Sequence, residues 1–179
     1  DKILGEIKEE YGQSLSEVAL PRIVSIFNDN NIKPEDIDKI IVVNGPGSFT
    51  GIRIGITIAK VYSWSLNIPI TTITSLEAMS LSSETAKYHV PAIDARRGYV
   101  YGSIYDKNLD FILENRYIYL EELNHILDKY DSKMFISCDQ FNFDVIFPKY
   151  QIDRVIKKHK NDSGVNPHSL VPCKLKKTE

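Results

Sequence analysis

The stretch "NGPGSFTGIRIG", residues 44–55, contains four glycines and directly follows the aliphatic run "KIIVV". Glycine is favoured where the backbone takes a positive φ or must approach another group closely. In this stretch the close approach can involve either the phosphates of a nucleotide or a second helix. Which of the two applies decides the local structure and the class of function.

The glycines do not match the two common phosphate-binding motifs. A Walker loop requires Gly-Lys followed by Ser or Thr, and no Gly-Lys pair occurs in the chain. The dinucleotide fingerprint G-x-G-x-x-G is matched by Gly45 and Gly47, but the next glycine, Gly51, comes one residue late. We therefore do not expect this stretch to hold a nucleotide.

A helix that begins with a serine cap fits the stretch better. Ser48 is a favoured N-cap residue, and Gly45, Pro46 and Gly47 then form the preceding turn. The isoleucines at alternate positions favour a strand instead, but the apolar segment exceeds the typical strand length of about five residues. The sequence therefore predicts a helix over residues 48–66.

Three small residues form a stripe along this predicted helix. Gly51, Gly55 and Ala59 recur every four residues and so lie on one face. Glycine inside a helix costs about 1 kcal/mol relative to alanine, so a favourable contact must offset it. Close approach of a second helix is such a contact.

The two halves of the chain repeat one order of elements. Strand, helix and strand are predicted at 2–10, 14–27 and 39–43, and again at 111–119, 120–130 and 133–137. A predicted hairpin at 89–106 precedes the second series, and the first series has none. We therefore expect an N-terminal subdomain, 1–84, and a C-terminal subdomain, 85–179, and infer that the full protein starts about two strands earlier.

Composition is ordinary for a soluble globular protein, with 42% hydrophobic and 26% charged residues. No apolar run reaches the roughly 20 residues of a membrane span, and the two cysteines predict a reducing cytoplasm. The net charge of −2 excludes a uniformly basic nucleic-acid binder. From Lys149 onward eight Lys and Arg accompany three Asp and Glu, so the tail is basic. A solvated surface is the preferred interpretation, and contact with RNA phosphates is the alternative.

The candidate catalytic residues lack the spacing of the known metal-binding and nucleophile motifs. The four histidines show no H-E-x-x-H pattern, and Ser48 is not within G-x-S-x-G, so we expect structural or surface roles. Asp94, Arg96 and Arg97 could bind an anion at the tip of the predicted hairpin. The preferred interpretation is a turn that is stabilised by the aspartate and flanked by surface arginines. Trp64 and the alternating tyrosines at 99–105 are predicted to pack in the core and across strands.

Several motifs resemble those of the bacterial TsaB family. They are "GPGSFTGIRIG" at 45–55, "AK" at 59–60, "IP" at 68–69, "SLEA" at 75–78, "IDARRGYVY" at 93–101 and "LVPCKLKK" at 170–177. The resemblance implies an α/β fold of the actin, Hsp70 and sugar-kinase type, built from two ribonuclease-H-like subdomains. The opening hairpin of the first subdomain is absent from this sequence.

The resemblance also implies a function. TsaB-like proteins are non-catalytic partners of a TsaD-like subunit, which transfers a threonylcarbamoyl group to the adenosine next to the anticodon of tRNAs that read codons starting with A. We expect no metal or cofactor on this chain, and ATP and a metal ion on the partner subunits, which include a TsaE-like ATPase. Contact with tRNA is then indirect, the location is cytoplasmic, and pairing with a second copy stays open.

The resemblance further implies that pairing uses helices 16–27 and 48–66. The residues predicted to form the partner interface are Ser16, Ala19, Ile23, Gly51, Gly55, Ala59 and Tyr62. The alternative function is a sugar- or acetate-kinase-like phosphotransferase on the same fold, and binding of ATP with Mg²⁺ by the isolated protein would favour it.

Overall fold

The computed structural model describes residues 2–10, 15–82 and 86–175. The chain divides into two compact units. Unit 1 contains Asp1–Asn44, Ser48–Ile73 and Ile156–Pro172, and unit 2 contains Gly45–Gly47, Thr74–Val155 and Cys173–Glu179.

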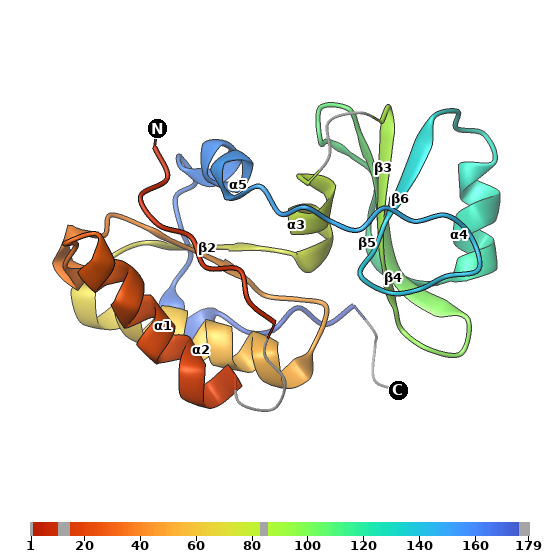
Figure 1. Cartoon of the computed structure of the whole chain (residues 1–179). Helices are drawn as coiled ribbons and strands as arrows, with labels where there is room; N and C mark the ends of the chain where they lie inside the picture. The colour runs from red at the N-terminus through yellow and green to blue at the C-terminus, as the bar shows by residue number, and fades with distance from the viewer. Residues whose placement is uncertain (1, 11–14, 83–85, 176–179) are drawn as a thin grey trace. The chain divides into compact units, whose positions relative to one another are not determined.

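Unit 1 is built on two parallel strands, β1 (Ile40–Val43) and β2 (Ile70–Ile73), which are joined through helix α2 (Phe49–Leu66). Helix α1 (Leu15–Asp29) lies beside α2, as the red and orange helices of Figure 1 show. Ser48 is the N-cap of α2, at the predicted position, and its hydroxyl accepts a hydrogen bond from the Gly51 amide at 3.3 Å. The longer apolar segment has therefore formed a helix despite its local alternation.

The core of unit 1 lies between α2 and the two strands. Ile56 and Ala59 of α2 pack with Ile70 of β2 and with Leu170, and all four side chains are buried. These contacts remove one face of α2 from water, which is the main source of stability for such a helix.

The segment 156–172 returns to unit 1 near the end of the chain and includes the 3₁₀ helix η2 (Pro167–Ser169). Val165 forms an antiparallel bridge with Ile70, and its amide donates to the Ile70 carbonyl at 2.7 Å. The Lys60 ammonium donates to the Leu170 carbonyl at 3.3 Å. The segment thereby covers the edge of β2 that β1 leaves open.

Unit 2 contains, within its described part, a four-stranded sheet in the order β5-β4-β3-β6. The strands are β3 (Tyr88–Asp94), β4 (Tyr99–Asp106), β5 (Phe111–Tyr119) and β6 (Lys133–Ile136). Strands β3, β4 and β5 form an antiparallel meander, and β6 is parallel to β3. Helices α3 (Ser75–Ser80) and α4 (Leu120–Leu127) lie on opposite sides of this sheet (Figure 1). Leu123 and Leu127 of α4 are fully buried against it.

One predicted strand is not formed in the structure. Residues 2–10 are extended but pair with no strand in the described part of the chain, so the predicted strand is not formed. They run along α1 instead, where an ion pair joins Glu9 to Arg22 at 3.1 Å. Helix α3 is capped by Thr74, whose hydroxyl accepts a hydrogen bond from the Glu77 amide.

The compact units differ from the predicted subdomains 1–84 and 85–179 at three points. The turn Gly45–Gly47 belongs to unit 2. The division in the chain follows Ile73, because α3 packs on β3 and β4 and so belongs with unit 2. The segment 156–172 belongs to unit 1, because Val165 and Leu170 make their contacts there. The final helix, α5 (Ile152–His159), spans the second division.

Trp64 was predicted to pack in the core, and this prediction is wrong. The side chain is 68% exposed on α2, with its ring edge-on to His168 at 6.2 Å. The buried face of α2 is narrow, since Ile56, Ala59 and Ser63 occupy it, and Trp64 points away from that face. The tyrosines of β4 do pack across strands, as Tyr99 does by stacking on Tyr117 of β5 at 4.6 Å.

The turn before β4 requires glycine at position 98. Gly98 has φ +79°, and a Cβ atom there would lie 2.6 Å from Cε2 of Tyr119. We expect Gly98→Ala to lower the free energy of unfolding by about 2 kcal/mol, since the left-handed conformation alone costs about 1–2 kcal/mol. Urea denaturation measures this, and adding Tyr119→Ala should recover the steric part only. An unchanged midpoint in Gly98→Ala would contradict the assignment.

A buried histidine gives unit 2 a pH dependence. His89 on β3 is 1% exposed, and burial lowers its pKa below the ordinary value near 6.5. Below pH 6.5 the unfolded chain therefore binds a proton that the folded protein excludes, and stability falls by up to about 1.4 kcal/mol per pH unit until the folded pKa is reached. Urea denaturation at pH 7.5 and 5.5 should show this loss, and the loss should shrink in His89→Leu but persist in the exposed-site control His125→Gln. Equal losses of stability in His89→Leu and His125→Gln would refute this role of His89.

Candidate docking site on α1 and α2

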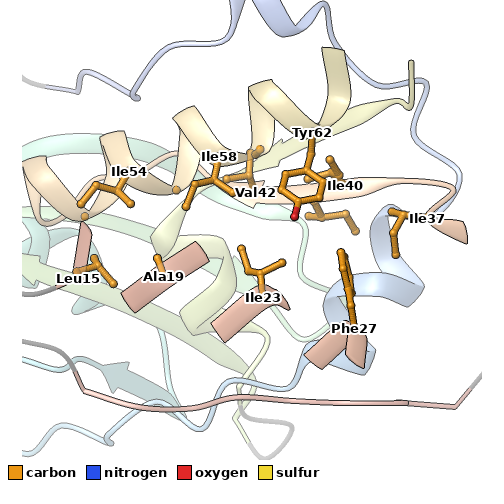
Figure 2. A pocket seen from close by; sticks show the side chains of 14 residues that line it. Leu15, Ala19, Ile23, Phe27, Ile37, Ile40, Val42, Ile54, Ile58 and Tyr62 are labelled. Atoms are coloured by element: carbon orange, nitrogen blue, oxygen red, sulfur yellow. The ribbon is translucent and has the colours of Figure 1, made fainter. Parts of the chain in front are cut away.

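An apolar cleft lies in unit 1 between α1, α2 and β1, with a volume of about 480 Å³. Figure 2 shows Ile54 and Ile58 of α2 pointing toward Ala19 and Ile23 of α1 across this space. The residues that line it are Leu15, Ala19, Ile23, Phe27, Ile37, Ile40, Ile41, Val42, Gly51, Ile54, Gly55, Ile58, Ala59 and Tyr62. Packing between α1 and α2 is thus incomplete along the middle of both helices.

Helix periodicity places the lining residues of α1. Leu15, Ala19, Ile23 and Phe27 are spaced by four residues, so they share the face that looks into the cleft. At one end of the cleft the Phe27 ring meets the Tyr62 ring edge-on, with centroids 6.2 Å apart. This aromatic contact joins the C-terminal halves of the two helices.

The predicted small-residue stripe lies on the cleft side of α2. A Cβ atom on Gly55 would have no neighbour within 4 Å, whereas one on Gly51 would touch the Leu15 side chain at 3.4 Å. Ala59 lies deeper and is 7% exposed. The stripe therefore faces α1 of its own chain, across a space that the side chains do not fill.

The structure brings six of the seven predicted interface residues together. Ala19, Ile23, Gly51, Gly55, Ala59 and Tyr62 all line the cleft. Ser16 does not, and it is exposed on another face of α1. Contact of these seven residues with a partner stays a prediction. Four lining residues were not predicted, although the four-residue spacing along each helix was a signal for them: Leu15, Phe27, Ile54 and Ile58.

The cleft offers apolar packing and little polar chemistry. Of the described residues that line it, only Tyr62 has a polar side-chain group, and none is charged. Within residues 2–10, 15–82 and 86–175, no group of three His, Cys, Asp or Glu residues comes together as a metal site. No helix in those ranges is long and apolar enough to cross a membrane. The chemistry of the cleft suits a polypeptide with apolar side chains.

A second stripe of α1 faces away from the cleft. Ser16, Leu20 and Val24 are spaced by four residues and are exposed, Leu20 at 46% and Val24 at 44%. On α2, Val61 is 55% exposed and is not among the cleft-lining residues. Leu20 and Val24 are neighbours on the surface of α1, and contiguous exposed apolar surface is a mark of protein-binding sites.

Comparison with known families decides the family of the chain. A family profile described as "TsaD: tRNA N6-adenosine threonylcarbamoyltransferase" matches residues 6–148. The chain belongs to this family.

Its curated relatives in the TsaD family include proteins that carry the name TsaB. The chain is 41% identical over 106 residues to the tRNA threonylcarbamoyladenosine biosynthesis protein TsaB of Bacillus subtilis. This alignment covers 59% of this chain and 46% of the relative. It is 34% identical over 92 residues to TsaB of Escherichia coli, and this alignment covers 50% of this chain and 40% of the relative. The predicted TsaB resemblance is confirmed, and the match spans about half the length of these relatives.

Solved structures confirm the predicted fold of this TsaD-family chain. YeaZ from Pseudomonas aeruginosa superposes with a TM-score of 0.75 at 19% identity, over 93% of this chain and 87% of that chain. A second structure, described as an uncharacterized protein with similarity to peptidase YEAZ from the same organism, gives a TM-score of 0.70 at 18% identity, over 89% and 83% of the two chains. The actin-like, ribonuclease-H-like α/β architecture is thereby established.

Proposed function

We propose that the protein is an accessory subunit in the synthesis of threonylcarbamoyladenosine on tRNA, and that it pairs with a TsaD-like subunit through the outer faces of α1 and α2. Support comes from the TsaB relatives, whose names state the biosynthesis of this nucleoside. The transfer itself belongs to the partner in this proposal, as do ATP, the metal ion and the link to a TsaE-like ATPase. The tRNA is reached through the partner, in the cytoplasm.

The observation that carries the proposal is the set of exposed aliphatic side chains on α1 and α2. Leu20 and Val24 extend from one helix and Val61 from the other, each exposed by between two fifths and three fifths. Of the seven interface residues predicted from the sequence, Ser16 lies in this surface. A helix pair of the partner would bury these side chains, and burial stabilises by about 25 cal/mol per Å² of apolar area.

Co-purification with a TsaD-like subunit of the same organism, followed by a transfer assay, tests the proposal. We expect a stable complex, and transfer to tRNA that depends on adding this protein in its full-length form. Calorimetry of the isolated protein with ATP and Mg²⁺ separates the proposal from the phosphotransferase alternative. Micromolar ATP binding without the partner, or full transfer activity without this protein, would overturn the proposal.

A further inference from the structure

The side of the unit 2 sheet that faces away from α4 is only partly covered by α3. Val100 of β4 packs in the core with Leu123 of α4, and a Cβ on Gly102 would meet Leu123 at 3.1 Å. Because successive side chains of a strand point to opposite faces, the alternate residues of β4 lie on the other side. There the Asn115 side-chain amide donates to the hydroxyl of Thr74, the N-cap of α3, at 3.2 Å. Helix α3 has only six residues, so it covers only part of this side.

Four tyrosines form a continuous aromatic surface on this side of the sheet. Tyr99 and Tyr101 of β4 lie opposite Tyr119 and Tyr117 of β5, and we call the four together the tyrosine surface. The rings of Tyr99 and Tyr117 stack in parallel with centroids 4.6 Å apart. Tyr119 meets Tyr99 at 5.2 Å, and Tyr101 meets Tyr117 at 5.6 Å. Tyr99 is 36% exposed and Tyr119 is 39% exposed, so the surface is open to solvent.

Two exposed arginines stand in the turn that leads into the tyrosine surface. Arg96 and Arg97 have φ of 67° and 56°, which residues other than glycine rarely adopt, and strain of this kind gathers at functional sites. Hydrogen bonds hold the turn in this shape. The Asp94 carboxylate accepts from the Arg96 amide at 2.9 Å, and the Asp139 carboxylate accepts from the Asp94 amide at 2.7 Å. The two arginines are thereby kept at the end of the tyrosine surface.

Aromatic rings on an open sheet beside arginines are the arrangement that binds single-stranded RNA. Unpaired bases stack on the faces of the rings, and guanidinium groups pair with the phosphates that flank those bases. Tyrosine and arginine are also enriched where proteins bind one another. The proposed function favours RNA, since it places the protein in the synthesis of a tRNA nucleoside. The net charge of −2 gives no general attraction for RNA, so a contact must come from a local surface.

We propose that the tyrosine surface of unit 2 binds unpaired nucleotides of RNA. Bases stack on the exposed rings of Tyr99 and Tyr119, and Arg96 and Arg97 pair with the adjoining phosphates. The choice of RNA rests on the proposed function, and the inference adds a direct contact with RNA to the link through the partner. It also gives a use to the arginine turn, which the docking surface on α1 and α2 leaves unexplained.

Fluorescence anisotropy of the full-length protein with a labelled oligouridylate of about ten nucleotides tests the stacking. Tyr99→Ala combined with Tyr119→Ala should weaken binding at least about tenfold, because stacking on both rings is lost. Tyr99→Phe combined with Tyr119→Phe keeps the rings and should bind within about twofold of the wild type. Tyr150→Ala removes a tyrosine that is 40% exposed between β6 and α5, and this control should leave the affinity for RNA unchanged.

Three results of this experiment would overturn the proposal. They are no binding of the oligouridylate by the wild type, equal binding by the alanine and phenylalanine double variants, and equal affinity for an RNA duplex of the same length. The duplex is informative because its paired bases cannot stack on side chains, so equal affinity would mean that only the phosphates are bound.

The arginines provide a second test that does not depend on the folding of the alanine double variant. Arg96→Gln combined with Arg97→Gln should weaken binding at least about threefold and lower the slope of log affinity against log salt, because phosphate contacts release counterions. Lys107→Gln changes an exposed lysine in the loop between β4 and β5 and should alter neither quantity. An unchanged slope in the arginine double variant would contradict the proposal.

Binding of the TsaD-like subunit separates failure of this inference from failure of the proposed function. Leu20→Glu combined with Val24→Glu should lose the subunit but bind the oligouridylate like the wild type. Tyr99→Ala combined with Tyr119→Ala should keep the subunit while RNA binding falls. If this tyrosine variant loses the subunit and the wild type binds no RNA, the tyrosine surface binds protein. The inference is then wrong, and the proposed function stands.

Discussion

Leu20→Glu combined with Val24→Glu is expected to weaken binding of a TsaD-like subunit by at least about 100-fold while the protein stays folded. The two side chains are about half exposed on α1, so the isolated protein tolerates the charges. In a complex the same carboxylates would be buried without partners, which costs several kcal/mol, and each 1.4 kcal/mol is tenfold in affinity. Titration calorimetry with the partner measures the loss.

Val171→Glu serves as the control for this experiment. Val171 is 64% exposed and lies in unit 1, but on the returning segment and on neither helix. Val171→Glu should leave the affinity for the TsaD-like subunit unchanged. Equal binding by the double variant and the wild type would place the partner surface elsewhere.

Lys39→Met is expected to lower the free energy of unfolding by about 2 kcal/mol and to release the segment that follows α5. The Lys39 ammonium donates to the carbonyls of His159 and Asp162 at 2.7 and 2.6 Å, and to that of Lys160 at 3.2 Å. Hydrogen bonds to a charged group contribute about 1.5–3 kcal/mol each when buried, and partial exposure reduces this. Methionine keeps the aliphatic stem but removes the donor.

Two measurements check the Lys39 prediction. Urea denaturation gives the change in stability, and limited proteolysis should show faster cleavage between 156 and 172. Lys107→Met changes an exposed lysine in the loop between β4 and β5 and should alter neither result. A segment that stays protected in Lys39→Met would show that Val165 and Leu170 hold it without the lysine.

The local structure of α2 could be predicted because its signals are local. Ser48 as a cap and the length of the apolar segment outweighed the alternation of isoleucines, and the helix begins and ends as expected. The neighbour of the glycine stripe could not be predicted. Small side chains at four-residue spacing indicate a close approach, but the same spacing fits a partner helix, α1 or a strand.

The errors arise where distant parts of the chain decide the structure. Residues 2–10 have the alternation of a strand, but a strand forms only when another strand pairs with it. The return of 156–172 to unit 1 depends on contacts with residues far away in the sequence, among them the bridge between Val165 and Ile70 and the burial of Leu170. These contacts have no local sequence signal. Trp64 is apolar and yet exposed. The hydrophobicity of one residue does not show whether that residue lies on the buried side of its helix.

The return of residues 156–172 affects how the protein can be dissected. A contiguous fragment that stops after β2 or α3 would lose Val165 and Leu170, and Lys39 and Lys60 would lose their carbonyl acceptors. Expression of unit 1 alone would therefore require a two-piece design, in which a short linker replaces unit 2 and rejoins the chain near Ile156. A C-terminal truncation that removes Leu170 and Val165, although remote in sequence, would destabilise the unit that contains the two docking helices.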